Sequence, residues 1–188
     1  MFIIWVMIGS GYYTSSLCLK NVPGDFEKNG LYTSIFDIVA IVVAGCLSPY
    51  AGIRKTLIFS GMGSIVSSSL VISLTEESSV PLATFYTSSS RFFLSYGFAI
   101  LYMKHAALFP TFFLGTSLGM CHFGKGFAMF FMPMVAEAEH PWPNIVLTIC
   151  NTIWTAFAFF IIEKSAKELS EDEKYAQESH SQDSHQAS

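Results

Sequence analysis

The chain has 188 residues, of which 52% are hydrophobic and only 13% are charged, whereas a typical soluble domain has about 25% charged residues. Residues 1–162 carry equal numbers of acidic and basic side chains, so the net charge of −4 comes from an acidic end. This composition excludes an ordinary soluble globular domain, and without a basic patch we expect no nucleic-acid partner.

Six apolar segments are long enough to cross a bilayer, which takes about 20 residues of helix. They are Phe2–Leu19, Leu31–Pro49, Thr56–Leu74, Leu82–Met103, Phe112–Ala136 and Asn144–Ile162. Short polar or turn-rich stretches separate them. The pattern predicts an all-α membrane protein, with a six-transmembrane-helix bundle over residues 1–163 and a disordered, acidic cytoplasmic tail over 164–188.

The basic residues predict which ends of the helices face the cytoplasm. If the first helix starts on that side, Arg54, Lys55 and Lys104 lie in inner loops, and three lysines lie in the tail. The outer loops hold only Lys20 and Lys28. Because cytoplasmic loops carry an excess of Lys and Arg, we expect both termini to be cytoplasmic.

Three charged side chains fall inside predicted spans, where a charge is costly unless it faces protein or water. Asp37, Arg91 and Lys125 lie at similar depths, which allows contact across the bundle. One hypothesis is a polar cavity of net charge +1, in which Asp37 pairs with Arg91 or with Lys125. The alternatives are an ion pair that only fixes packing and, for Lys125, a side chain that reaches toward the interface.

Tyr12 and Tyr13 lie in the middle of the first predicted span, where a hydroxyl needs a partner or water. They are candidates for lining the cavity, although aromatic residues in membrane helices also serve packing. The sequence has no glycine-rich phosphate loop, no zinc pair at helical spacing and no GxSxG, and its four cysteines are scattered. We therefore expect no enzyme, no cofactor and no metal site.

Several stretches, in order, resemble the C-terminal six helices of the major facilitator superfamily, in its organic cation/anion/carnitine transporter branch. The stretch YYTSSLCLKNVPGD starts at Tyr12 and parallels that family's YYGLSLNLGNLGGD, and Asp37 falls on an acidic position twelve residues further on. The turn PYAGIRKT parallels the family's DRxGRRxT. It keeps Gly52 and Arg54, adds Lys55, and lacks the acid.

A second motif resembles the same branch. Arg91 stands nineteen residues before Pro110, as a base does before the proline of the family's ELYPTxxR, and Thr111 also matches. The acid and the arginine of that motif are replaced by Ala107 and Leu114. Lys125 lies one residue before the family's polar position, so the resemblance gives it no role.

The resemblance implies transport of small organic ions by alternating access, with the lipid bilayer and a second six-helix bundle as partners. That bundle would come from a missing N-terminal half, a partner chain or a second copy. The gating candidates are Gly52, Arg54, Lys55, Pro110 and Thr111, and the lost motif residues predict a weakened inner gate.

The positive charges favour anionic substrates, and we expect Arg91→Ala to abolish uptake while surface expression persists. Plasma membrane is the location that the resemblance implies. The alternative is a non-transporting, truncated or degenerate half-bundle that acts as a membrane subunit or regulator.

Overall fold

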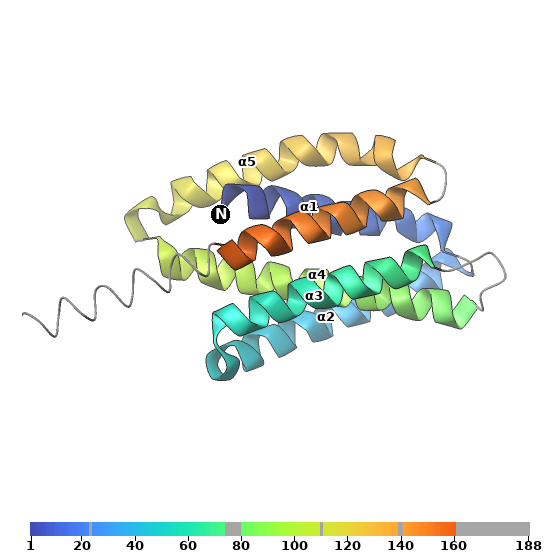
Figure 1. The fold of residues 1–188 in the computed structure, drawn as a ribbon, viewed down its shortest axis with the longest axis horizontal. Helices are drawn as coiled ribbons and strands as arrows, with labels where there is room; N and C mark the ends of the chain where they lie inside the picture. The colour runs from blue at the N-terminus through green and yellow to red at the C-terminus, as the bar shows by residue number, and fades with distance from the viewer. Residues whose placement is uncertain (23, 74–79, 110, 139–140, 161–188) are drawn as a thin grey trace, which may run out of the picture.

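The computed structural model describes residues 1–22, 24–73, 80–109, 111–138 and 141–160, and it contains only helices and turns over those ranges. The predicted tail at 164–188 lies outside them. The helices are α1 (Phe2–Leu17), the 3₁₀ turn η1 (Cys18–Asn21), α2 (Phe26–Ala51), α3 (Ile53–Ile72), α4 (Val80–Leu108), α5 (Thr111–Ala136) and the helix Trp142–Phe160 (Figure 1).

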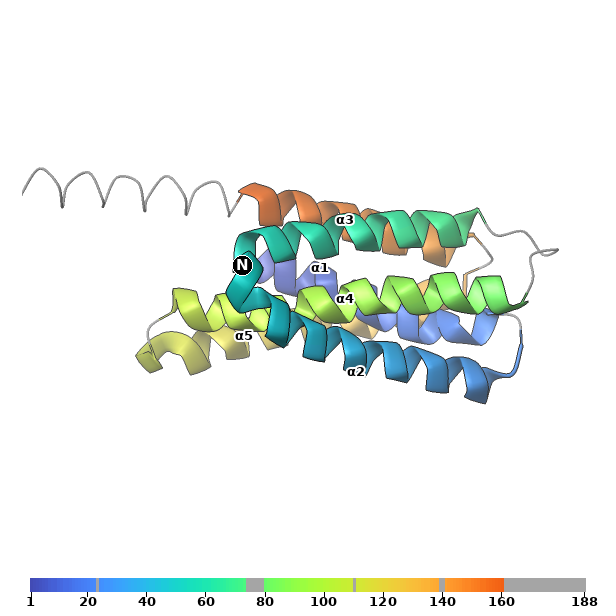
Figure 2. The same ribbon diagram turned by 90° about the horizontal axis from the view of Figure 1, so that it is seen from below.

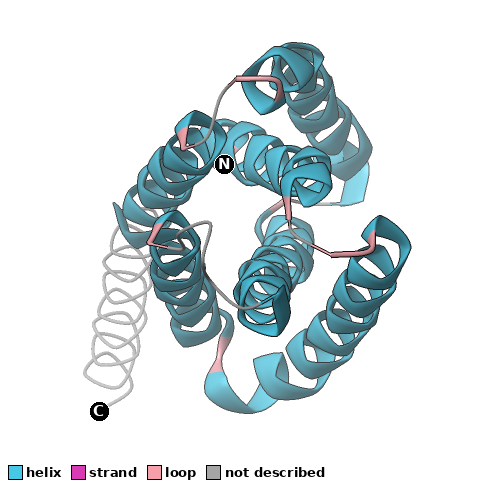
Figure 3. Cartoon of the chain, turned by 90° about the vertical axis from the view of Figure 1, so that its right-hand side faces the viewer, coloured by secondary structure: helices cyan, strands magenta, loops and turns pink. Residues whose placement is uncertain are grey.

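The helices run antiparallel to their chain neighbours and form a bundle, seen along its axis in Figure 3. α4 packs against α1, α2 and α3, and Figure 2 shows it between α2 and α3. α1 and α5 form a second closely packed pair. The prediction of an all-α membrane bundle is confirmed, because the described residues are almost entirely helical and include several helices fit to cross a bilayer.

Hydropathy separates the helices into two groups. In the described part of the chain, four helices are long and apolar enough to span a membrane: Phe2–Asn21, Phe26–Ala51, Lys55–Ile72 and Trp142–Phe160. α4 and α5, with 29 and 26 residues, are long enough but carry the charged side chains Arg91 and Lys125. A helix that is surrounded by other helices can be less apolar than one that faces lipid, and α4 has that central position.

Some helices extend beyond the predicted apolar segments. α2 begins at Phe26 and α4 continues to Leu108, because backbone hydrogen bonding does not stop where the apolar run stops. Gly52 ends α2 and starts α3 with a φ of 78°, a left-handed conformation that glycine adopts without a steric penalty. The short α2–α3 connection therefore depends on glycine at this position.

Polar contacts also join the helices. Asn151, fully buried on the helix Trp142–Phe160, donates from its amide to the Ser68 hydroxyl of α3 at 3.3 Å. The indole N–H of Trp154 donates to the Asn151 side-chain oxygen, also at 3.3 Å. In a bilayer, helices associate through such hydrogen bonds and close packing, because lipid is as apolar as the helix faces.

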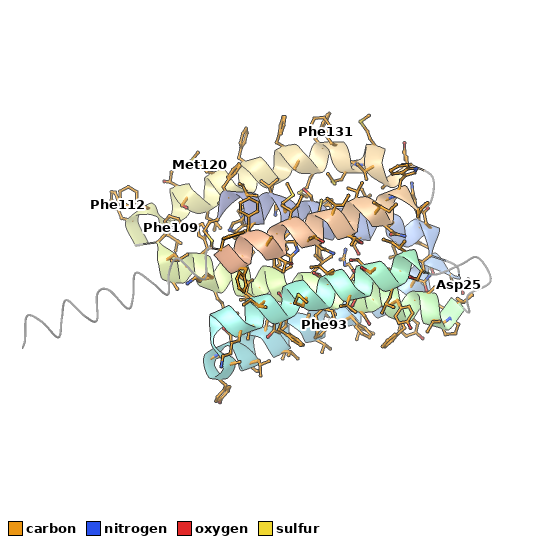
Figure 4. The ribbon with its side chains drawn as sticks, viewed as in Figure 1. Asp25, Phe93, Phe109, Phe112, Met120 and Phe131 are labelled. Carbon is orange, nitrogen blue, oxygen red and sulfur yellow. The ribbon has the colours of Figure 1, made fainter. Side chains whose placement is uncertain are left out.

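Apolar side chains cover the outside of α5. Phe112, Met120 and Phe131 project away from the bundle in Figure 4, and Phe123 is 79% exposed. An exposed apolar surface of this extent is expected where a protein faces lipid or another membrane bundle.

Candidate substrate cavity

A cavity of about 370 Å³ lies among α1, α2, α4 and α5. Its walls are mainly aromatic and aliphatic, with few polar groups. The lining residues are Gly9, Tyr12, Tyr13, Asp37, Ile41, Ser95, Phe98, Ala99, Tyr102 and Lys125. An apolar cavity with a small number of convergent polar groups is typical of a binding site for a small molecule.

Arg91 of α4 binds groups on two other helices. Its Nη2 lies 2.8 Å from Oδ2 of Asp37 on α2, and its Nη1 donates to the backbone carbonyl of Tyr12 on α1 at 3.1 Å. Nη1 also donates to the Ser16 hydroxyl of α1. The guanidinium carbon stands 3.9 Å from the centroid of the Tyr12 ring. Arg91 thus links α1, α2 and α4 through its side chain.

Asp37 accepts hydrogen bonds from further groups. The Ser95 hydroxyl donates to Oδ1 at 2.5 Å, and the Tyr12 hydroxyl donates to Oδ2 at 3.3 Å. A carboxylate in a bundle interior needs such compensation, since an unpaired buried charge is strongly unfavourable. Of the two pairings predicted for Asp37, the structure contains the one with Arg91.

Arg91 itself is only 7% exposed and is not among the residues that line the cavity. Its charge is balanced by Asp37, and most of its donors are engaged. Arg91 therefore has the geometry of a group that holds Asp37 and Tyr12 in place. The predicted cavity candidates Tyr12, Tyr13, Asp37 and Lys125 do line the cavity, and Arg91 contacts two of them, Tyr12 and Asp37, from behind the cavity wall.

Lys125 of α5 is the basic residue among those that line the cavity. Its Nζ lies 5.2 Å from the centroid of the Phe98 ring of α4, close enough for a cation–π interaction. No carboxylate of the described residues lies within ion-pair distance of it. The Lys125 ammonium thus lies beside Phe98 in the cavity in this conformation.

The two tyrosines occupy different positions. The Tyr12 ring is stacked against Arg91 and its hydroxyl contacts Asp37, so it belongs to the ion-pair network as well as to the cavity wall. Tyr13 is 43% exposed at the rim of the cavity. The cavity is therefore accessible beside Tyr13.

Sequence reasoning missed Ser95, Phe98 and Tyr102, which also line the cavity. A signal for them was present: they follow Arg91 by four, seven and eleven residues, and residues at this spacing share one helix face. Gly9 was missed too, because a glycine gives no sign of what it contacts. The Tyr102 hydroxyl also lies 3.0 Å from Nε2 of His122 on α5.

The gating candidates are only partly visible. Gly52 forms the α2–α3 turn, and Lys55 is exposed in the first turn of α3. Pro110 and the side chains of Arg54 and Thr111 lie outside the described part of the structure. Their gating role remains a prediction from the sequence.

The described residues contain no group of three or more His, Cys, Asp or Glu side chains that could hold a metal ion. The polar groups that line the cavity are the hydroxyls of Ser95 and three tyrosines, the Asp37 carboxylate, which is paired with Arg91 behind the wall, and the Lys125 ammonium. This arrangement is suited to binding a small ion.

Comparison with known proteins identifies relatives of the chain. No family profile matches it. Over 111 residues it is 28% identical to Solute carrier family 22 member 16 of Bos taurus, covering 59% of this chain and 19% of that protein. Over 111 residues it is 30% identical to Organic cation/carnitine transporter 2 of Homo sapiens, covering 57% and 19%.

Over this segment the chain is similar to two solute transporters, one of which is named for organic cations and carnitine. The resemblance to this branch of the major facilitator superfamily is thereby confirmed, and the chain is an integral membrane protein. The matched segment spans about a fifth of the length of each of these transporters.

Proposed function

We propose that the chain forms half of a facilitator-type carrier that moves small organic ions across a membrane by alternating access. The support is its similarity to organic cation/carnitine transporters, together with a cavity bounded by four of its helices. The cavity is accessible beside Tyr13 and the exposed Ile41. In this proposal a second six-helix bundle closes that side, and the two bundles rock about the bound substrate.

We propose further that Lys125 binds an anionic group of the substrate. Asp37 and Arg91 cancel each other, so the ammonium of Lys125 gives the cavity a net positive charge. The rings of Phe98, Tyr12 and Tyr102 would contact the apolar part of the substrate. A relative is named for carnitine, a zwitterion whose carboxylate would suit Lys125 while aromatic faces suit its quaternary ammonium.

The proposed orientation puts both termini in the cytoplasm and the carrier in the plasma membrane. The motif positions Pro49, Ala107 and Leu114, neutral in this chain, would then lie at the cytoplasmic side. Fewer charged contacts there would hold the outward-facing state less firmly, because a charge network loses its stabilising effect when several members are neutral.

The observation that carries the substrate proposal is the position of Lys125, and Lys125→Gln tests it in the complete carrier that contains this chain. The expected result is a loss of about thirtyfold or more in kcat/KM for a radiolabelled aryl carboxylate, since removing one partner of a close charge pair costs roughly 2–5 kcal/mol. Surface expression should be unchanged.

Lys28→Gln is the matched control, because Lys28 lies outside the cavity and pairs with Asp25. Equal uptake by Lys125→Gln and the unmodified carrier would remove Lys125 from substrate binding. If the carboxylate binds but is not transported by any assembly of the chain, the chain is the non-transporting half-bundle of the alternative hypothesis.

A further inference from the structure

Gly9 of α1 and Lys125 of α5 are in unusually close contact. A Cβ atom placed on Gly9 would stand 2.5 Å from Cδ of Lys125 and would also overlap its Cγ. Real Cβ atoms do not approach other carbon atoms so closely. The methylene groups of Lys125 therefore occupy the space that any larger residue at position 9 would fill.

This contact determines where the charge lies. Lysine has a flexible stem, and in a membrane helix such a stem usually carries the ammonium toward the interface. Here the stem lies against the backbone of α1 at Gly9, and the ammonium stands beside the Phe98 ring in the cavity. Gly9 itself is buried and lines the cavity.

We propose that Gly9 is a positioning residue, which holds the Lys125 ammonium in the cavity and thereby sets the preference for substrates with an anionic group. The inference rests on the proposed function, because it assigns Lys125 to substrate binding. The position of the ammonium can nevertheless be measured without any substrate.

Two other glycines supply matched controls on α5. A Cβ on Gly126, next to Lys125 in the chain, would meet nothing within 4 Å. A Cβ on Gly124 would overlap the Phe2 ring and lie 3.2 Å from a methyl group of Val6, so Gly124→Ala disturbs the same α1–α5 contact without touching Lys125. General loosening of this helix pair can thus be separated from displacement of Lys125.

The first measurement is made on the full chain in detergent micelles, with its lysines converted to ¹³C-dimethyl-lysines, which keep their charge. The Lys125 signal is identified by its loss in Lys125→Ala. In the unmodified chain the Phe98 ring should shift this signal away from that of the exposed Lys28. In Gly9→Ala it should move to the position of an exposed lysine, and in Gly126→Ala and Gly124→Ala it should stay.

A Lys125 signal that is unchanged in Gly9→Ala overturns the proposal. If Gly9→Ala does not fold, Gly9→Ala combined with Lys125→Ala decides the question, since the second change removes the overlapping Cγ and Cδ. If the double variant folds, the loss of folding in Gly9→Ala came from overlap with the Lys125 side chain, which supports the proposal. If the double variant does not fold, the proposal is overturned.

The second measurement compares binding of benzoate and benzyltrimethylammonium, which share an aryl group and differ in charge. Gly9→Ala should weaken benzoate binding by about tenfold and leave the cation within about twofold, as expected when only a charge partner is lost. In Lys125→Ala, adding Gly9→Ala should have no further effect on benzoate, because the two changes act through one side chain.

Additive losses in that pair of variants, or equal losses for both probes, would contradict a role through Lys125. If the unmodified chain binds neither probe, the proposed function is at fault. The dimethyl-lysine signals still decide whether Gly9 holds Lys125 in the cavity.

Discussion

The charged side chains at the centre of the bundle have two different roles: Arg91 and Asp37 form an ion pair, and Lys125 is a single cation. The hydrogen bonds of Arg91 join α1, α2 and α4, whereas Lys125 faces the cavity. A cation that is paired with a carboxylate and bonded to two other helices contributes to holding the helices together. A cation that faces an open volume can contribute to binding, which is why the two bases have different predicted roles.

Removal of Arg91 should affect the fold before it affects transport. Arg91→Ala leaves Asp37 charged and nearly buried, and breaking one partner of a buried pair costs roughly 3–5 kcal/mol. We expect a clearly lower thermal unfolding temperature for the detergent-solubilised chain. The sequence alone predicts that Arg91→Ala loses uptake and keeps normal surface expression. From the structure we expect surface expression to fall as well.

Two comparisons make the Arg91 experiment decisive. Replacing both partners, Arg91→Leu with Asp37→Leu, should cost less than Arg91→Ala alone, because no charge stays unpaired. Lys28→Ala removes a pair whose side chains are 73% and 66% exposed, and such surface pairs contribute about 0–1 kcal/mol. A double variant less stable than Arg91→Ala would mean that the pair is not the source of the effect.

At the scale of helices, the apolar segments are the part of the fold that sequence predicts well. In lipid every backbone group must bond within its own helix, so an apolar run of sufficient length is a helix. The run from Phe112 to Ala136 differs from α5 by one residue at its start. The ends of α2 and α4 were harder to predict, since both helices extend past their apolar segments.

The order of helices around the bundle could not be predicted from the sequence. This order determines which side chains meet at the candidate site. Asp37, Arg91 and Lys125 have similar depths, so depth alone allowed either pairing for Asp37. Only the packing of α4 between α2 and α1 selects Arg91. The contact of Gly9 with Lys125 was equally invisible, because it depends on which faces of α1 and α5 meet.

Asn151 should make a measurable contribution to the contact between α3 and the helix Trp142–Phe160. Asn151→Ala leaves the indole N–H of Trp154 without its acceptor and removes the bond to Ser68. Interhelical hydrogen bonds in membranes contribute about 0.6 kcal/mol on average, and a buried donor left unsatisfied costs roughly 1–3 kcal/mol. We expect destabilisation of that order, smaller than for Arg91→Ala.

Thr152→Val on the same helix is the control. Thr152 is exposed, and its hydroxyl bonds only to the carbonyl of Thr148 in its own helix. Its replacement should change the unfolding temperature little. If Asn151→Ala were as harmless as Thr152→Val, the polar contact would not stabilise this helix pair.

At the scale of the whole molecule, lipid is the solvent of the bundle, and the helices must cross it with alternating direction. α2 runs from Phe26 to Ala51, so Lys28 lies near its start and Lys55 lies just beyond its end, in the first turn of α3. At about 1.5 Å per residue, a helix of this length exceeds the roughly 30 Å thickness of the hydrocarbon layer. The two lysines should therefore lie on opposite sides of the membrane.

The excess of basic residues in the predicted inner loops puts Lys28 outside and Lys55 inside. In a cysteine-free chain expressed in cells, Lys28→Cys should react with a membrane-impermeant maleimide in intact cells. Lys55→Cys should react only after the membrane is permeabilised. The reverse result would invert the orientation and place the neutral motif positions outside, and reaction of both cysteines in intact cells would mean that α2 does not cross the bilayer.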